Sequence, residues 1–320
     1  MASKKRVLCG LGVAAVWLAA IFLLPVWALA GVLAAGAIVC LYELCAMLKH
    51  RGYVLPFKTL AVFTVLWFIS QYAATLMPTP THISGAPRMG LLLLLSSGNI
   101  LLVVFFLGMS FWHLLSAKIE KPLETLALTL FSFFYIPVML SLFLKVVSFG
   151  ARAVEAFGED ELVYERGIFV ALVLVLVTKM SDTGGYFIGS AFGKHKMCPR
   201  LSPGKSWEGT AGGYAFSLAA AGAMVGLAHA FPEASWLRGL YALTAAPWQM
   251  IWFFGTVILV VTVGILGDLL ESLFKRQCGV KDSSALFPAM GGFFDTFDSI
   301  IFVPLVFLFS LYIQVVLLEI

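Results

Sequence analysis

Long apolar runs are the feature of this sequence that most limits its fold. Stretches of about 18 or more apolar residues, enough to cross a bilayer as a helix, recur along the chain. The chain is 61% hydrophobic and 12% charged, and a soluble core cannot hide that much apolar surface. We therefore predict an all-α polytopic membrane protein.

The apolar runs predict nine membrane-spanning helices. Their predicted bounds are 7–25, 27–48, 58–77, 89–115, 124–146, 167–188, 209–230, 248–272 and 299–318. The first run follows three cations and precedes a stretch that resembles a signal-peptide cleavage site. Its length favours a helix that is retained in the mature protein.

Lysines and arginines are unevenly distributed between the predicted loops. With the N-terminus inside, the inner segments carry 15 of these residues and the outer segments carry four. Because cytosolic loops hold the excess of cations, we predict a cytosolic N-terminus and an extracytosolic C-terminus. No basic block is long enough to indicate nucleic-acid binding.

Polar residues are concentrated in the second half of the chain. We predict an N-terminal transmembrane region, 1–166, of about five spans with an outer loop. A C-terminal catalytic region, 167–320, carries two charged cytosolic loops, 189–208 and 273–298. A secondary transporter would place its ionisable residues near the bilayer midplane, so this one-sided arrangement favours an enzyme.

Carboxylates occur at the predicted cytosolic ends of three helices. They are Asp182, Asp268, Glu271, Asp295 and Asp298. Asp268 and Glu271 are three residues apart and should share a helix face, as should Asp295 and Asp298. The five cysteines and five histidines show no metal-binding spacing, so a metal site would use carboxylates, which indicates magnesium.

Simpler interpretations stay open for some of these acids. Glu271 and Lys275 could form an exposed pair on one helix face. Asp298 could be a charge at a helix start, where the macrodipole favours it. Glu43, within the second predicted span, could belong to a buried pair or line a lateral groove.

Cations and glycine-containing turns accompany the acids. The stretch SPGKSWEG supplies Lys205 and backbone N–H groups that suit phosphates, although it lacks the spacing and the preceding strand of a P-loop. Lys275, Arg276 and Lys281 lie near the carboxylates in the sequence. Magnesium, carboxylates and lysines around one point are typical of phosphoryl or nucleotidyl transfer. The alternative is that the lysines only determine topology.

Two blocks of the sequence resemble the phosphatidate cytidylyltransferase (CDP-diacylglycerol synthase) family. One block contains SLFKR, KDS and GGFFDTFD between residues 272 and 298. The other contains SDTGGYFIGSAFGK and LSPGKSWEG, which begin at residues 181 and 201. The N-terminal spans resemble the family only in being apolar.

The resemblance implies an enzyme of phospholipid synthesis that condenses CTP with phosphatidate, releases pyrophosphate and leaves CDP-diacylglycerol in the membrane. It implies magnesium, with potassium as a candidate for a second site, and it places Asp268 and Asp295 at the metal-binding aspartates. The implied catalytic positions are Asp182, Lys205, Glu208, Lys275, Arg276, Lys281, Asp282 and Asp298. The implied nucleotide-binding positions are Ser202, Lys205, Ser206, Lys275, Arg276 and Lys281.

The sequence departs from the family pattern at two positions. Met290 stands where the family usually has histidine, and Thr296 stands where it usually has arginine. Neither change removes a metal-binding carboxylate, but either could alter phosphate binding or leave a chain without activity.

The resemblance also implies where the protein works. We expect an integral protein of the bacterial inner membrane whose active site faces the cytosol, because CTP arrives there. CTP, phosphatidate and membrane lipids are the expected partners, a homodimer is left open, and nucleic acid is not expected. A CTP-dependent enzyme acting on another lipid is the main alternative, followed by a membrane transporter.

Overall fold

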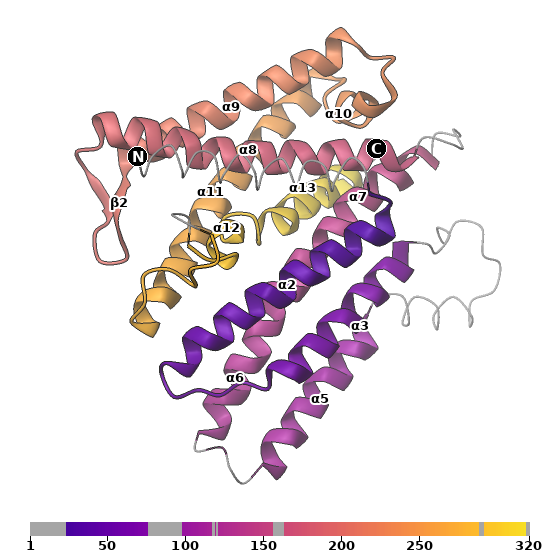
Figure 1. Ribbon diagram of the computed structural model, residues 1–320. Coiled ribbons are helices and arrows are strands. Elements are labelled where there is room, and N and C mark those ends of the chain that lie inside the picture. The colour runs from indigo at the N-terminus through magenta and orange to yellow at the C-terminus, as the bar shows by residue number, and fades with distance from the viewer. Residues whose placement is uncertain are drawn as a thin grey trace, which may run out of the picture. The chain divides into compact units, whose positions relative to one another are not determined.

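The computed structural model describes residues 24–75, 98–116, 119, 121–155, 163–287 and 291–317 (Figure 1). The predicted first span lies outside these residues except for its last two positions. Met290 also lies outside the described residues.

Helices form most of the described chain (Figure 1). The N-terminal set is α2 (Val26–Lys49), α3 (Phe57–Thr75), α5 (Asn99–Leu115), α6 (Pro122–Phe133), the π-helix η2 (Phe134–Val138) and α7 (Met139–Glu155). The C-terminal set is α8 (Val163–Phe192), α9 (Trp207–Ala230), the 3-10 turn η3 (Ser235–Leu237), α10 (Arg238–Ala242), α11 (Pro247–Cys278), α12 (Phe294–Phe297) and α13 (Val303–Leu317).

Six segments of the described chain are long and apolar enough to cross a membrane. They are Val26–Lys49, Phe57–Thr75, Pro122–Val147, Phe169–Phe192, Trp207–Ala230 and Pro247–Cys278. Ile100–Leu115 and Val303–Gln314 are shorter apolar helices. Each of these segments overlaps one predicted span, which confirms the helical architecture and fits an integral membrane protein. The count of nine spans and their orientation stay predictions.

A small antiparallel sheet interrupts the predicted all-helical chain between α8 and α9. Strand β1 (Lys196–Cys198) pairs with β2 (Ser202–Ser206), with Lys196 opposite Ser206 and Cys198 opposite Ser202. Pro199 and Pro203 disfavour a helix here, because proline lacks a backbone N–H. Backbone N–H and C=O groups of β1 and β2 instead form hydrogen bonds with each other across the sheet.

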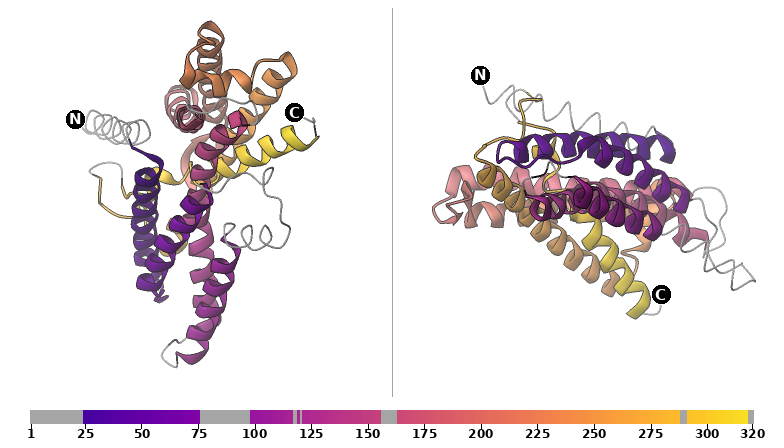
Figure 2. Two further views of the ribbon diagram at one scale, coloured as in Figure 1. Left: turned by 90° about the vertical axis from the view of Figure 1, so that its right-hand side faces the viewer. Right: turned by 90° about the horizontal axis from the view of Figure 1, so that it is seen from below.

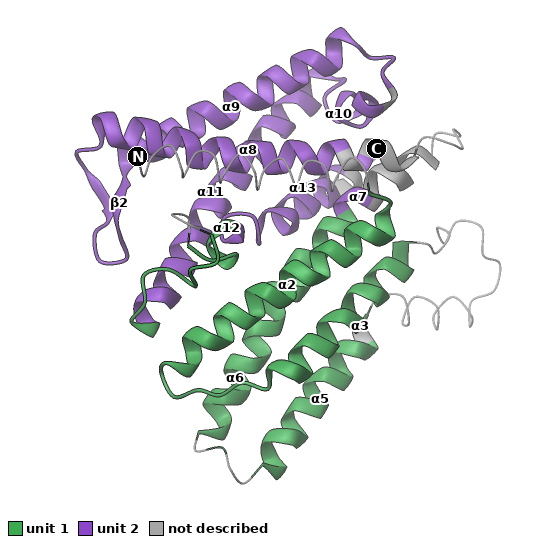
Figure 3. Ribbon diagram, in the orientation of Figure 1, with its two compact units in different colours: residues 1–145, 278–296 green, residues 146–277, 297–320 purple. Residues whose placement is uncertain are grey.

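The chain forms two compact units, which Figure 3 shows in different colours. Unit 1 contains residues 1–145 and 278–296, and unit 2 contains residues 146–277 and 297–320. The segment between α11 and α12 therefore groups with the N-terminal helices, although it lies late in the sequence. The two transmembrane regions predicted from the sequence divide at residue 166, and this boundary does not coincide with the boundaries of the two units.

Unit 1 has an aromatic core between its helices. Within it, α2 and α3 are neighbouring helices joined by a short loop (Figures 1 and 2). Phe105 of α5 stacks on Phe133 of α6 with ring centroids 4.1 Å apart, and Trp67 of α3 meets Phe133 edge-on. The Trp67 indole donates to Ser141 Oγ at 2.9 Å, so its one polar atom is satisfied in the core.

Unit 2 depends on a close approach of α8 and α9, which small residues allow. A Cβ added to Gly184 would lie 2.5 Å from the Gly212 carbonyl oxygen, and one added to Gly209 would lie 2.9 Å from that of Gly185. Helices in membranes often associate through such small residues, because the backbones can then approach closely. Glycines of the family-like block that begins at residue 181 thus allow α8 and α9 to pack together.

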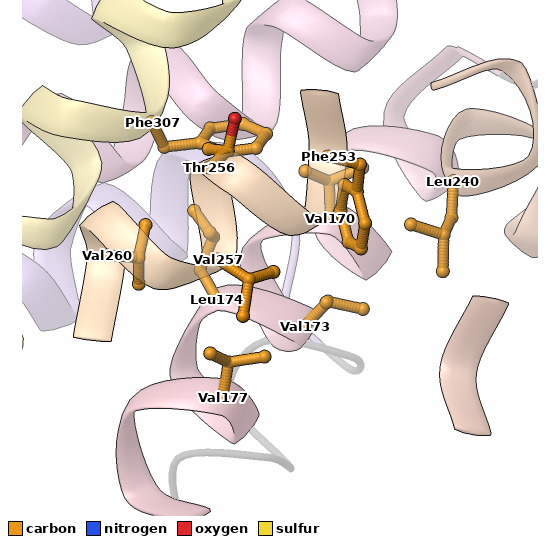
Figure 4. Close-up of a pocket in the computed structure, with 10 residues that line it drawn as sticks. All are labelled: Val170, Val173, Leu174, Val177, Leu240, Phe253, Thr256, Val257, Val260 and Phe307. Carbon is orange, nitrogen blue, oxygen red and sulfur yellow. The ribbon is translucent and has the colours of Figure 1, made fainter. Parts of the chain in front are cut away.

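A small apolar cavity also lies within unit 2. Side chains of α8, α10, α11 and α13 line it, and all of them are apolar except Thr256 (Figure 4). Its volume of about 10 Å³ is close to the smallest that holds one water molecule. The cavity is therefore too small for a nucleotide or an acyl chain.

Candidate active site

The last turns of α11 carry an acid and a base that pair in the interior. Glu271 has an exposed fraction of 0%, and its Oε2 lies 2.6 Å from Lys275 Nζ. The expected pair is therefore present, but the alternative that placed it on the exposed surface is wrong. A buried ion pair costs desolvation, which is offset only by close geometry and further hydrogen bonds.

Three carboxylates of unit 2 come together beside this pair. One oxygen from each of Asp268, Glu271 and Asp298 lies within 4.8 Å of the other two, and we call these residues the carboxylate cluster. Gly267 makes the approach possible, because a Cβ there would lie 2.5 Å from the Asp298 carbonyl oxygen. The cluster thus depends on a glycine directly before its first acid.

Asp298 is held in an unfavourable environment for a negative charge. Its exposed fraction is 8%, and burial raises its pKa well above the usual range, with the Asp268 carboxylate raising it further. The Lys179 ammonium lowers the pKa, and the backbone N–H of Ser299 donates to Asp298 Oδ1 at 2.5 Å. A cation bound at the cluster would relieve this crowding of like charges.

The expected helix face shared by Asp295 and Asp298 is not present. Asp295 belongs to the short helix α12, which ends at Phe297, and α13 begins only at Val303. The simpler interpretation of Asp298 as a helix-start charge is therefore wrong as well. Asp298 instead occupies the turn between two helices, from which it reaches the carboxylate cluster.

Lys205 brings a positive charge from the hairpin to the cluster. Its Nζ lies 2.6 Å from Asp268 Oδ2 and donates to the carbonyl oxygen of Ile265 at 3.3 Å. The side chains of Lys205 and Asp268 are 22% and 28% exposed. Strand β2 and helix α11 thus present opposite charges at a partly accessible position.

Asp182 is joined to the same region through two residues. Lys179 Nζ lies 3.2 Å from Asp182 Oδ2 and donates to Ser299 Oγ at 3.2 Å, while Ser299 donates to Asp182 at 3.2 Å. Neither Lys179 nor Ser299 was among the predicted site residues. The only signal for Ser299 was its position next to Asp298.

Several predicted site residues make structural contacts in the β1–β2 hairpin and at the start of α9. Ser206 is 2% exposed and caps α9, since its Oγ accepts from the Gly209 N–H at 3.1 Å. Glu208 accepts from the His195 backbone at 3.2 Å and contacts its ring Nδ1 at 2.5 Å. Ser202 lies in β2, where its partner residue is Cys198.

The remaining predicted positions lie near the end of α11 or in unit 1. Arg276 is exposed, and its Nε donates to the Leu201 carbonyl at 3.3 Å, which fastens the hairpin to α11. Lys281 and Asp282 are exposed in the unit 1 segment. Asp295 belongs to unit 1, so its predicted metal pairing with Asp268 stays a prediction. Thr296 donates from Oγ1 to the Gly292 carbonyl at 3.4 Å.

Four predicted residues are thus brought together in unit 2, and one further acid completes the group. Asp268 and Asp298 lie beside Glu271, Lys275 pairs with Glu271, and Lys205 pairs with Asp268. Sequence spacing alone had left the role of Glu271 undecided. Carboxylate oxygens at this separation are the ligand type that magnesium prefers. Such a group is suited to binding a divalent cation together with phosphates.

The comparisons with known proteins agree with this chemistry. The Cytidylyltransferase family profile matches residues 4–314. Phosphatidate cytidylyltransferase of Haemophilus influenzae is 39% identical over 135 residues, or 42% of this chain, and that of Pseudomonas aeruginosa is 48% identical over 135 residues, again 42% of the chain. The chain spans less than half the length of these relatives, 43% and 44% respectively. A relative of that name from Mycobacterium bovis is 29% identical over 93% of this chain and 84% of its own length.

Proposed function

The chain belongs to the Cytidylyltransferase family, and from this membership we propose that it transfers a cytidylyl group from CTP to phosphatidate. The products would be CDP-diacylglycerol, retained in the membrane for phospholipid synthesis, and pyrophosphate. The observation that carries the proposal is the carboxylate cluster with Lys205 and Lys275 paired to two of its members. Relatives named phosphatidate cytidylyltransferase support the choice of substrates.

The carboxylate cluster fits the magnesium that the family resemblance implies. Asp268, Glu271 and Asp298 would hold the ion. The role of Asp295 as a metal ligand is proposed from the family resemblance alone. When bound, magnesium neutralises phosphate charge and favours displacement at the α-phosphorus of CTP. A second site for potassium belongs to the same proposal.

The protein's own residues would act mainly by binding and orienting two anions. A phosphate oxygen of phosphatidate attacks the α-phosphorus in line, and the bond to pyrophosphate breaks. This oxygen is already an anion near neutral pH, so no strong general base is required. The greater obstacle is repulsion between the substrates, and holding them in an attacking geometry lowers it.

Lysines at the cluster would bind the leaving pyrophosphate. Lys205 and Lys275 each pair with one carboxylate, and an ammonium group has three donors. Lys205 uses its ammonium group for Asp268 and the Ile265 carbonyl, which leaves a third donor for a phosphate oxygen, and Lys275 would add positive charge to the site. Arg276 is exposed at the end of α11 and would extend this positive surface toward CTP. Lys281 is also exposed, and its role in binding CTP is proposed from the family resemblance.

The two substrates would reach the site by different routes. CTP would approach from the cytosol, and phosphatidate would keep its acyl chains in the bilayer. We propose the bacterial inner membrane because the matched relatives are bacterial. The cation bias between loops supports a carboxylate cluster near the cytosolic face. A homodimer remains compatible with this arrangement.

Purified protein tests the activity directly. Incubated in mixed micelles with CTP, phosphatidate and MgCl2, it should form CDP-diacylglycerol, and chelation of magnesium should stop the reaction. Parallel reactions with a polyprenyl phosphate or another lipid phosphate identify the acceptor, since Thr296 and Met290 depart from the family pattern. Transfer to one of these lipids and not to phosphatidate would contradict the proposed substrate.

A further inference from the structure

Glu43 is a buried acid in α2 for which the proposed reaction has no role. Its exposed fraction is 3%, and it lies six residues before the end of an apolar helix of 24 residues. Among the described residues no lysine or arginine forms an ion pair with it. A buried carboxylate requires compensation, so the groups that surround Glu43 indicate why the acid is there.

Four donors surround the Glu43 carboxylate, and all of them come from a segment about 240 to 251 residues later. Oε1 accepts from Ser284 Oγ at 2.5 Å and from the Phe293 N–H at 3.0 Å. Oε2 accepts from Ser283 Oγ at 2.9 Å and from the Phe294 N–H at 2.7 Å. The acid therefore holds both ends of one loop, residues 283–287 and 291–294, which we call the signature loop.

The same loop orients Asp295, a predicted metal ligand. Asp295 Oδ2 accepts from the Ser283 N–H at 2.9 Å, from Ser283 Oγ at 3.0 Å and from the Gly292 N–H at 2.6 Å. The Ser283 hydroxyl lies within hydrogen-bonding distance of Glu43 and Asp295 and has one proton to share between them. Movement of Glu43 would therefore be transmitted to Asp295 through a single side chain.

The two glycines of the loop fit this arrangement closely. A Cβ on Gly292 would lie 1.9 Å from Ser283 Oγ and 2.6 Å from Glu43 Oε2. Gly291 has a φ of +93°, and a Cβ there would lie 2.4 Å from Asp295 Oδ2. The loop therefore has no space for side chains where it passes between the two carboxylates.

We propose that Glu43 is a positioning residue that anchors the signature loop and thereby sets the orientation of Asp295 for metal binding. The role rests on the proposed function. Glu43 would not touch the reacting atoms. It acts as residues behind a metal ligand do, by fixing the direction of the ligand through hydrogen bonds.

Substitutions at Glu43 distinguish the proposed hydrogen-bonding role of its carboxylate from a role in packing alone. Glu43→Gln conserves size but offers one acceptor atom in place of two, so two of the four donors lose their partner. Glu43→Asp keeps the charge but withdraws it by about 1.5 Å, one C–C bond. Thr64→Val is the matched control, because Thr64 is also fully buried in unit 1 and bonds only its own helix, to Leu60 O at 2.8 Å.

The experiment compares full-length variants in detergent micelles by three measurements. Hydrogen exchange of the Phe293 and Phe294 amides reports the anchoring, calorimetric titration with MgCl2 alone reports metal binding, and CDP-diacylglycerol formation reports turnover. Glu43→Gln should accelerate exchange in the loop and weaken magnesium binding and turnover by about 10-fold to 100-fold. Glu43→Asp should give intermediate values, and Thr64→Val should leave loop exchange and magnesium affinity unchanged.

Two results would overturn the proposal. One is unchanged loop exchange or unchanged magnesium affinity in Glu43→Gln. The other is an equal loss of affinity in Thr64→Val, which would make the effect one of general stability. A wild-type protein that binds magnesium but makes no CDP-diacylglycerol would contradict the proposed function, while the exchange and titration results would still decide the role of Glu43.

Discussion

At the scale of single residues, burial distinguishes two acid–base pairs of the C-terminal half. Glu271 and Lys275 are 0% and 12% exposed, whereas Glu233 in the pair with Arg238 is 94% exposed. Removing one partner of a buried pair leaves the other charge uncompensated. An exposed pair contributes little, because water screens it.

Glu271→Gln should therefore destabilise the protein by about 3 kcal/mol, because Lys275 would remain buried without its carboxylate. The measurement is thermal unfolding in detergent, with Glu233→Gln as the exposed control. We expect the control to change stability by less than about 1 kcal/mol. Equal, small changes in both variants would contradict a buried ion pair in α11.

Sequence spacing predicts which neighbouring residues pair, but it does not predict whether the pair is buried. The i,i+4 spacing of Glu271 and Lys275 predicts their pairing, but burial depends on Asp298 and other groups remote in the sequence. The partners of Glu43 lie more than 200 residues away, so no local pattern identifies them. The family resemblance identified Asp268 and Lys205 as site residues, and in the structure Lys205 Nζ lies 2.6 Å from Asp268 Oδ2.

At the scale of helices and strands, two glycines of α9 differ in whether helix packing requires them. Gly212 of α9 faces α8, where an added Cβ would lie 2.4 Å from the Ile188 Cβ. Gly222 lies further along the same helix and has no atom within 4 Å of an added Cβ. The first glycine is required by helix packing, and the second is not.

Gly212→Ala should lower stability by about 1 to 3 kcal/mol, since α8 and α9 must separate to admit the methyl group. Gly222→Ala, the matched control, should be neutral or stabilising by up to about 1 kcal/mol, because alanine favours a helix. Unfolding temperatures of the two variants in the same detergent test this difference. Equal values would show that α8 and α9 do not pack through these glycines.

Most helices could be predicted from the sequence, but the short elements could not. Apolar runs are long, so α2, α8, α9 and α11 follow from length and composition alone. The hairpin of β1 and β2 depends on pairing between two short polar segments, which carry no comparable signal. The turn between α12 and α13 replaces a predicted continuous helix, because Asp298 and Ser299 bond locally.

At the scale of the whole molecule, orientation in the membrane rests on the distribution of cations. The hairpin region and the segment after α11 carry many of the predicted inner lysines and arginines. The positive-inside rule therefore assigns both regions to the cytosol and the connection between α7 and α8 to the other side. The carboxylate cluster needs this orientation to meet cytosolic CTP.

Single-cysteine labelling in sealed vesicles tests the orientation. In a cysteine-free background, Lys194→Cys and Lys281→Cys should react with an impermeant reagent only from the cytosolic face. Glu159→Cys, in the connection between α7 and α8, should react only from the opposite face. The reverse pattern would remove the access of cytosolic CTP to the site.

Turnover of Asp268→Asn tests whether the carboxylate cluster supports magnesium-dependent cytidylyl transfer. A neutral amide is a much poorer magnesium ligand than a carboxylate, so CDP-diacylglycerol formation from CTP and phosphatidate should fall by about a thousandfold. Asp295→Asn should show a comparable loss, while both variants remain folded and inserted in the membrane. Near-normal turnover in Asp268→Asn, at matched protein levels and saturating MgCl2, would show that the carboxylate cluster does not hold the catalytic magnesium.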